Sequence, residues 1–215
     1  MYSYDDKYTN SKAAFGDKPE KILVSHYKNI DNSSVVLDIG AGQGRHAFFL
    51  AKNGFAVEVL EPSIVGINQM KEVAEKENLP IHFTHGSLAE FEPKITAYSA
   101  VLLFGIIQIL TREQISELLI SLKSWTAEDS LIFITAFSTD EPSYEKHKKD
   151  DVEIGKNSFK DSKDFIRTYL EKDELLDLFT GYQVIHHDEY LSEPHHHGDG
   201  KMHQHAVIEA VLRVG

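Results

Sequence analysis

The stretch Val35-Val36-Leu37-Asp38-Ile39-Gly40-Ala41-Gly42-Gln43-Gly44 decides the fold, because an apolar run changes there into glycine at every second position. Residues 35–39 are typical of a buried strand. Residues 45–52 follow directly and carry apolar side chains at helical spacing. Glycine permits backbone angles that other residues resist, and it leaves room for a ligand beside the main chain. A strand, a glycine-rich turn and a helix N-terminus therefore predict a corner that binds a nucleotide-like ligand.

Strands and helices alternate on the C-terminal side of this corner. We expect strands at 56–60, 81–84, 100–104 and 131–136, and helices at about 44–53, 63–78 and 112–125. Alternation of this kind predicts an α/β fold with a mostly parallel sheet and helices on both faces. After a short helix at 173–179, two strand-like runs at 182–191 and 203–214 have no helix between them. We expect these two runs to pair antiparallel at one edge of the sheet.

The 215 residues are enough for one domain with a substantial core, and no repeat or linker divides them. Residues 1–34 are polar with scattered aromatic side chains and a helix expected at 18–27. This segment either packs on the domain or closes over the ligand as a flap. Residues 137–161 are polar and charged, and they are long for a connection in a compact domain. We expect them to form a mobile or functional lid.

Composition excludes several classes of function. The formal net charge is −12, and the one short basic cluster, 146–149, is followed at once by two aspartates. Phosphate backbones repel such a chain, so nucleic acid is not an expected partner. The absence of cysteine excludes disulfides and thiolate chemistry. With no apolar run of membrane-spanning length and no signal-peptide pattern, we expect a cytoplasmic protein, either a monomer or a homodimer.

The glycine turn has a further acidic residue on each side. Asp38 precedes the first glycine, and Glu61 ends the second expected strand. With Gly86-Ser87-Leu88 and the antiparallel ending, this pattern resembles the class I S-adenosylmethionine-dependent methyltransferases. A dinucleotide-binding domain opens similarly, but its GxGxxG spacing needs the third glycine one position after Gly44. The resemblance implies a Rossmann-like seven-stranded sheet and S-adenosyl-L-methionine as the methyl donor.

Within this class, three parts of the chain are similar to the small tellurite-resistance-type methyltransferases. They are residues 4–19, residues 44–55 with an arginine directly after the glycine turn, and the C-terminal part with its histidine-bearing loop. The resemblance covers most of the chain and residues 137–161 least. It implies transfer of a methyl group to a small-molecule nucleophile, such as a chalcogen oxyanion or a thiol.

The resemblance also implies a cofactor site. Asp38 would lie under the methionine part of the cofactor, and Glu61 would accept hydrogen bonds from both ribose hydroxyls. Ile64 would lie against the adenine, with Ser87 and Leu88 at its edge, although an aspartate is common in the family where this serine stands. The expected set is Asp38, Gly40, Ala41, Gly42, Gly44, Arg45, Glu61, Pro62, Ile64, Ser87, Leu88, Phe104, Gly105 and Ile106.

Seven of the twelve histidines lie between residues 186 and 205. His203 and His205 are two apart at a strand start, so they would face the same way. In the resembled group this hairpin borders the acceptor pocket, and one of the two would take a proton from the acceptor. The same spacing also suits a metal, with Glu193 and residues 195–197 available from the loop. Since histidine-rich stretches also bind metals adventitiously, no metal ligand is assigned.

Two functions remain open at this point. The first is a small-molecule methyltransferase, in which an anionic acceptor would need no general base and a neutral acceptor would. The second is a non-catalytic module that uses the same fold to hold S-adenosylmethionine or a metal. Binding of S-adenosylmethionine does not separate the two, whereas turnover with an acceptor does.

Overall fold

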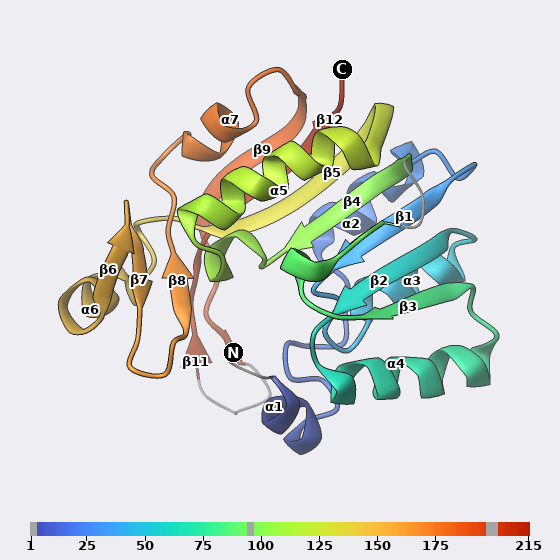
Figure 1. Ribbon diagram of the computed structural model, residues 1–215, viewed down its shortest axis with the longest axis horizontal. Coiled ribbons are helices and arrows are strands. Elements are labelled where there is room, and N and C mark those ends of the chain that lie inside the picture. Colours follow the sequence, from blue (N-terminus) through green and yellow to red (C-terminus); the bar gives the residue numbers. More distant parts are fainter. Residues whose placement is uncertain (1–3, 94–96, 197–201) are drawn as a thin grey trace.

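A seven-stranded sheet in the order β3-β2-β1-β4-β5-β12-β9 organises the chain (Figure 1). The parallel strands are β1 (Val35–Ile39), β2 (Ala56–Glu61), β3 (Ile81–His85), β4 (Tyr98–Phe104) and β5 (Thr126–Phe137). Strand β12 (Ala206–Arg213) is antiparallel both to β5 and to the edge strand β9 (Gln183–Leu191). The predicted parallel sheet with an antiparallel ending is thus confirmed. This computed structural model describes residues 4–93, 97–196 and 202–215.

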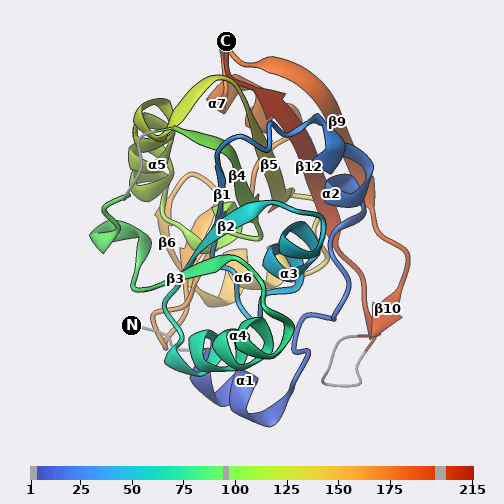
Figure 2. The ribbon, with the colours of Figure 1, turned by 90° about the vertical axis from the view of Figure 1, so that its right-hand side faces the viewer.

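Helices cover both faces of the sheet (Figure 2). One face carries α2 (Lys21–His26), α3 (Arg45–Lys52) and α4 (Ile64–Glu77), and the other carries α5 (Arg112–Trp125) and α7 (Glu174–Leu178). A short N-terminal helix, α1 (Asp5–Asn10), lies against α4. The described residues also form three 3-10 turns: η1 (Tyr27–Asn29), η2 (Leu88–Glu90) and η3 (Ile107–Ile109). None of the helices in the described ranges is both long and apolar enough to cross a membrane.

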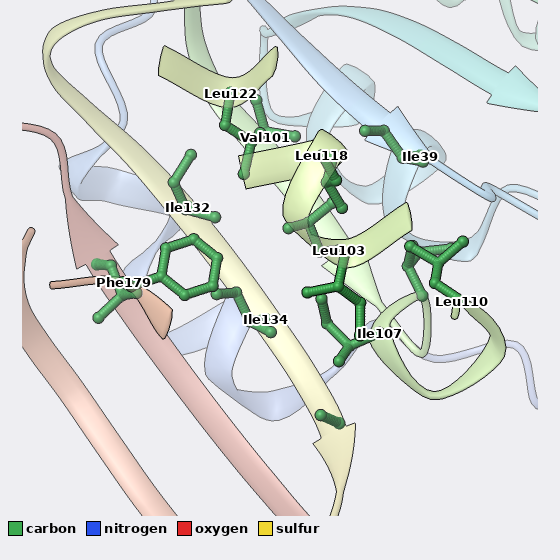
Figure 3. Close-up of a cluster of buried hydrophobic side chains, with 14 of the residues drawn as sticks. Ile39, Val101, Leu103, Ile107, Leu110, Leu118, Leu122, Ile132, Ile134 and Phe179 are labelled. Atoms are coloured by element: carbon green, nitrogen blue, oxygen red, sulfur yellow. The ribbon is translucent and has the colours of Figure 1, made fainter. Parts of the chain in front are cut away.

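The central strands are apolar on both faces because each face packs against helices. Leu103, Ile132 and Ile134 point toward α5 and meet Leu118 and Phe179 in the core shown in Figure 3. Alternate residues of the same strands, such as Leu102, point into the second core under α2, α3 and α4. The sheet is thus packed on both faces, and loops lie at the carboxyl ends of its parallel strands.

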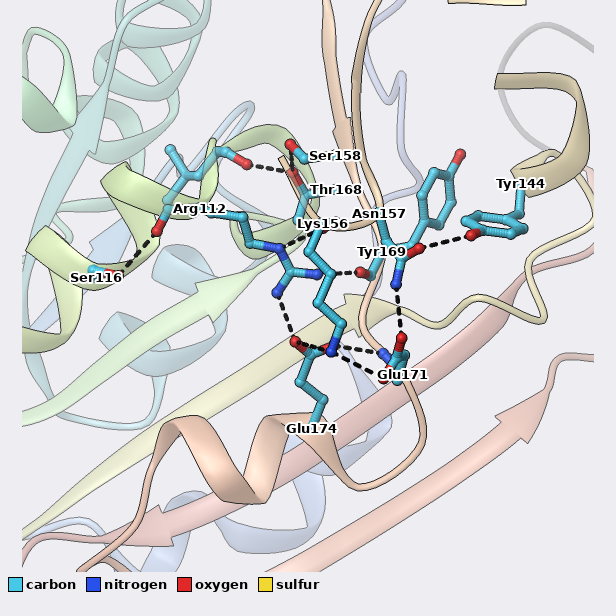
Figure 4. A network of polar contacts seen from close by, with 11 residues as sticks. Arg112, Ser116, Tyr144, Lys156, Asn157, Ser158, Thr168, Tyr169, Glu171 and Glu174 are labelled. Carbon is cyan, nitrogen blue, oxygen red and sulfur yellow. Dashed lines mark hydrogen bonds and ion pairs between the residues drawn. The ribbon is translucent and has the colours of Figure 1, made fainter. Parts of the chain in front are cut away.

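Residues 137–161, which we expect to form a mobile or functional lid, contain regular elements. They include helix α6 (Tyr144–Asp150) and the strands β6 (Val152–Gly155) and β7 (Ser158–Lys160). These two strands form a small antiparallel sheet with β8 (Ile166–Thr168), which follows the segment in sequence. The sequence pattern that would predict these three strands is weak, because only Ser158, Phe159 and Thr168 among their residues are buried. Arg112 anchors the unit: its guanidinium donates to Lys156 O at 2.7 Å, to Tyr169 O at 2.8 Å and to Glu174 at 2.9 Å (Figure 4).

Some element bounds also differ from the prediction. Strand β5 begins at Thr126 instead of residue 131, because its first part bulges between the pairs Tyr98–Thr126 and Ala100–Leu131. The final run divides into β11 (Met202–His203), which pairs with β10 (His195–His196), and the longer β12. The expected helix at 18–27 begins only after Pro19, because the residue before a proline is disfavoured in a helix.

Strand β2 buries a charged residue. Glu58 is 3% exposed, and its two carboxylate oxygens accept hydrogen bonds from Tyr98 Oη at 2.7 Å and from Thr84 Oγ1 at 3.1 Å. Burial raises the pKa of the Tyr98 hydroxyl, and the bond to Glu58 adds to this rise. A buried carboxylate is tolerated only when donors of this kind satisfy it.

Replacing Tyr98 by phenylalanine should therefore lower the free energy of unfolding by about 2 kcal/mol, because one carboxylate oxygen loses its donor. Tyr182→Phe is the matched control, since the hydroxyl of Tyr182 is buried without a hydrogen-bond partner among the described residues. This control should be neutral or slightly stabilising. Urea unfolding at neutral pH measures both variants, and equal losses in the two would contradict the account.

Candidate functional site

The glycine turn lies at the carboxyl edge of the parallel strands, where sheets of this type bind ligands. Gly40 N donates to Leu60 O at 2.7 Å, so the turn crosses back over the end of β2. The φ angle of Gly40 is +68°, and a Cβ there would stand 2.4 Å from Ile106 Cδ1. Only glycine fits this position without strain or movement of Ile106. The structure thus brings together the turn and the segment after β4, as the sequence indicates.

Glu61 holds the glycine turn through hydrogen bonds to the backbone. Its carboxylate is 2% exposed and accepts hydrogen bonds from Gly42 N at 2.7 Å and from Ser63 N at 2.8 Å. Burial raises the pKa of this carboxyl, and the two backbone bonds oppose the rise. Each carboxylate oxygen has a second lone pair, so Glu61 can accept from a ligand as well. The side chain expected to bind ribose therefore also sets the shape of the loop.

Two buried polar atoms lie without partners at the base of the turn. Asp38 is 1% exposed, and its Oδ2 accepts no hydrogen bond from any residue that the structure describes. Burial raises the pKa of Asp38 to about 7; the Arg45 guanidinium opposes this rise and the Glu61 carboxylate adds to it. His46 is 5% exposed, and its Nε2 likewise has no partner within the described ranges. Unpaired buried atoms are costly, so they mark a place that a polar ligand can satisfy.

His46 was not predicted as a site residue. Burial lowers the pKa of its imidazole well below the usual value, and the Arg45 charge lowers it further, so the ring is neutral. The ring lies 4.4 Å from that of Phe104, measured between centroids. The available signal was a polar residue on the buried face of α3, beside Ala47 and Leu50.

The N-terminal segment covers the glycine turn. Tyr8 of α1 is buried, and its hydroxyl would lie 3.0 Å from a Cβ placed on Gly42. The ring of Tyr8 stacks on Tyr4 with a centroid distance of 5.8 Å. Asp5 Oδ1 accepts a hydrogen bond from the hydroxyl of Ser63, the N-cap residue of α4. Residues 4–8 thus contact both the turn and the helix that follows Glu61.

Two side chains of the turn hold this segment down. Gln43 donates from Nε2 to Ser11 O at 2.7 Å and accepts at Oε1 from Ala14 N at 2.8 Å. Arg45 donates from Nη1 to Phe15 O at 2.8 Å and from Nη2 to Glu20 at 2.7 Å. Arg45, expected in the cofactor site, therefore has its guanidinium engaged with residues 15–20.

The remaining expected residues surround the same edge. Ala41 and Ile106 are buried, while Ile64 at the start of α4 is 43% exposed. The hydroxyl of Ser87 donates to Glu90 Oε2 at 2.6 Å, and its oxygen keeps lone pairs that can accept. Four others contact the surrounding protein. The carbonyl of Pro62 accepts from His85, and a Cβ on Gly44 would meet Met70. Leu88 packs against the core under α5, and Gly105 N, next to Phe104 at the end of β4, donates to Thr135.

Across the edge, a histidine meets a buried carboxylate. Glu141 is 6% exposed, and its Oε1 lies 3.1 Å from His205 Nδ1, while its Oε2 accepts from Ala206 N at 2.8 Å. The ring of His205 stacks on Phe137 with centroids 5.0 Å apart. Because Phe137 ends β5 and pairs with Val207, this pair lies at the same edge as the glycine turn. Glu141 was missed, because nothing in the sequence sets it apart from the other acids of 137–161.

His203 lies beside His205, with ring centroids 6.0 Å apart. The side chains of residues 195–197, which the sequence offered as metal ligands, lie outside the described residues, as do residues 198–201. The hypothesis of an adventitious metal in this loop therefore stays a prediction.

Comparison with known proteins agrees with this geometry. Residues 1–147 match the family described as tellurite resistance protein TehB. TehB from Haemophilus influenzae is 21% identical with a TM-score of 0.72, over 99% of this chain and 66% of that one. A methyltransferase from Methanosarcina mazei is 15% identical with a TM-score of 0.71, over 92% of this chain and 99% of that one. The 1,6-didemethyltoxoflavin-N1-methyltransferase of Burkholderia thailandensis, with S-adenosylhomocysteine bound, is 13% identical with a TM-score of 0.64. The match covers 99% of this chain and 81% of that one. No curated protein sequence matches the chain.

The seven-stranded sheet with its glycine corner has the fold of the class I S-adenosylmethionine-dependent methyltransferases. Within this class, the chain belongs to the TehB family, whose match spans more than half of its length. The chain covers about two thirds of the Haemophilus influenzae protein.

Proposed function

We propose that this protein transfers the methyl group of S-adenosylmethionine to a small protic nucleophile, such as a thiol, at the carboxyl edge of the sheet. The observation that carries the proposal is the pairing of two features at that edge. One is the glycine turn closed by Glu61, and the other is the contact between Glu141 and His205. A donor site and a proton acceptor at one edge are what methyl transfer to a neutral acceptor requires.

The residues of the corner fit S-adenosylmethionine. The backbone of Gly40, Ala41 and Gly42 would lie against its methionine part, because glycine leaves the main chain open to a ligand. The unpaired Oδ2 of Asp38 would accept a hydrogen bond from the amino group of the cofactor, directly or through water. Glu61 would accept from the ribose hydroxyls with the lone pairs that Gly42 N and Ser63 N leave. Residues 64, 87, 88 and 104–106 would border the adenine and the sulfonium.

When bound, the sulfonium supplies a methyl group that is already electrophilic. The protein then has to orient the acceptor and exclude water, which can contribute about 7–11 kcal/mol. For a neutral acceptor it also has to remove a proton. Glu141 holds the Nδ1–H of His205, so that Nε2 is the atom that takes the proton, and the carboxylate stabilises the imidazolium that results. His203 would border the same pocket, beside His205.

This arrangement favours a thiol, amine or hydroxyl over a chalcogen oxyanion. An oxyanion is already deprotonated and needs no base, and the buried Glu141 would repel it. The formal charge of −12 adds to this repulsion over the whole surface. A chalcogen oxyanion remains the second candidate, because of the family to which the chain belongs.

The N-terminal segment would act as a flap. Tyr8 lies over Gly42, and Gln43 and Arg45 hold residues 11–20 down, so entry of the cofactor would require this segment to open. Closure afterwards would exclude water from the transferred methyl group. The small sheet of β6, β7 and β8 would bound the acceptor pocket on the other side.

An acceptor panel tests the proposal. Tag-free protein is incubated with S-adenosylmethionine and, separately, with small thiols, amines, phenols, tellurite and selenite, and S-adenosylhomocysteine is measured. We expect a protic acceptor to raise turnover well above the blank and the oxyanions to raise it less. Turnover with oxyanions alone would refute the assignment of a protic acceptor and support the second candidate.

A further inference from the structure

Three side chains able to bind a metal meet between α7 and the edge strand β9, apart from the residues assigned to methyl transfer. They are Asp173, which directly precedes α7, and His187 and Glu189 of β9. One ligand atom from each lies within 4.8 Å of the other two. His187 and Glu189 are two apart on the strand, so they share one face. That face is the one covered by α7, which lies beside β9 in Figure 1.

The spacing suits a metal ion better than a hydrogen bond. His187 Nε2 lies 3.3 Å from Glu189 Oε1, about the separation of two donors on one tetrahedral zinc ion. This nitrogen is buried and makes no hydrogen bond with any described residue, so the two atoms are close without being aligned as donor and acceptor. A buried ring nitrogen left in this way is rare in proteins. A metal ion between the two atoms would use both lone pairs.

The backbone holds the carboxylates in place. Asp173 N donates to Glu189 Oε1 at 2.9 Å, which orients that carboxylate toward the start of α7. The side chain of His187 is 15% exposed and that of Glu189 is 18% exposed, while Asp173 is exposed. The cluster is therefore open on the Asp173 side, where an ion could enter with its water.

The charge of the cluster is not balanced by the protein. Among the ion pairs of the described ranges, none brings a lysine or arginine to Asp173 or Glu189. The nearby cations are used elsewhere, since Arg112 pairs with Glu174 and Lys156 with Glu171 and Glu174. The two carboxylates leave a negative charge that a divalent cation would balance.

We propose that Asp173, His187 and Glu189 bind a divalent first-row transition metal ion. One imidazole and two carboxylates are ligands that Zn²⁺ accepts, and water would complete its coordination. The ion would tie the start of α7 to β9, which lies at the edge of the sheet and has a neighbouring strand only on one side. Its role would be structural, and it would stabilise the folded chain by mass action.

Zinc titration of the full-length, tag-free protein, stripped with EDTA, tests this proposal. The histidine-rich loop is a competing site, so the titrations use a background in which His195, His196, His197 and His203 are changed to asparagine. We expect this background to bind one Zn²⁺ by calorimetry and to gain thermal stability with zinc. His187→Gln and Glu189→Gln should each lower the zinc affinity at least tenfold and abolish the gain.

The matched control is His186→Gln in the same background. His186 lies next in sequence, on the opposite face, where its Nε2 is 3.1 Å from Glu209. Zinc binding should survive this change. If the background variant binds no zinc, or if His187→Gln and Glu189→Gln bind it as the background does, the proposal is wrong. Should either glutamine variant fail to fold, as judged by circular dichroism, the exposed Asp173→Asn serves in its place with the same expected loss.

Discussion

Valine in place of Gly42 is expected to weaken S-adenosylmethionine binding at least 100-fold, or by about 2.7 kcal/mol. Gly42 has a φ angle of +60°, at which a β-branched residue is strained. The new side chain would also press on Tyr8 and fill the space where the cofactor approaches the main chain. Calorimetric titration with S-adenosylmethionine measures the loss.

Gly54→Val is the matched control for backbone strain. Gly54 has a φ angle of +89°, and a Cβ there would have no neighbour within 4 Å. Its stability should fall as that of Gly42→Val falls, but its affinity for S-adenosylmethionine should stay unchanged. Glu61→Gln should also lose affinity, because an amide has one acceptor oxygen, so its NH₂ would face the N–H of either Gly42 or Ser63. Normal binding by both Gly42→Val and Glu61→Gln would refute the assignment of this corner.

The second large effect is expected at His205. With a neutral acceptor, His205→Gln should lower kcat by about 10²–10⁴, because the proton then has no acceptor of its own. The Kd for S-adenosylmethionine and the KM for the acceptor should change little. With an acceptor that is anionic before it binds, the same variant should lose much less, since no proton has to be removed. Steady-state kinetics with the two kinds of acceptor give this comparison.

Glu141 should act through His205 as a positioning residue. Glu141→Gln keeps the size of the side chain, and its amide oxygen can still accept from His205 Nδ1 but has no charge to stabilise the imidazolium, so we expect a loss of kcat smaller than that of His205→Gln. The double variant should lose little more than His205→Gln alone, because the two residues act as one unit.

His186→Gln is the control for these two changes, because His186 also contacts a glutamate, Glu209, but on β9 away from the carboxyl edge. Its kcat should stay at the level of the unchanged protein. If His205→Gln has the same kcat as this control with every neutral acceptor, the assigned base is wrong.

The sheet could be predicted because its signals are local. The apolar runs of β1, β4 and β5 and the glycines after β1 each follow from a few neighbouring residues. The order of the strands then follows from the class of fold that the glycine spacing and Glu61 indicate. The antiparallel ending could be predicted because the sequence shows no helical pattern between the two strand-like runs at 182–191 and 203–214.

The contacts that complete the site could not be predicted in the same way. Glu141 and His205 are 64 residues apart, and only the pairing of β5 with β12 brings them together. Arg45 stands where the family has an arginine, yet its guanidinium reaches 25 to 30 residues back, to Glu20 and Phe15. Both outcomes depend on tertiary packing, which residue spacing does not encode.

Transfer of a labelled methyl group tests the central claim most directly. The protein is given S-adenosylmethionine with a deuterated methyl group together with a thiol acceptor that the panel identifies, and the products are followed by mass spectrometry. We expect the deuterated methyl group on the thiol sulfur, in amounts equal to the S-adenosylhomocysteine formed. If the protein binds S-adenosylmethionine but no acceptor of the panel gains the label above the blank, the protein holds the cofactor without using it, and the account of methyl transfer is wrong.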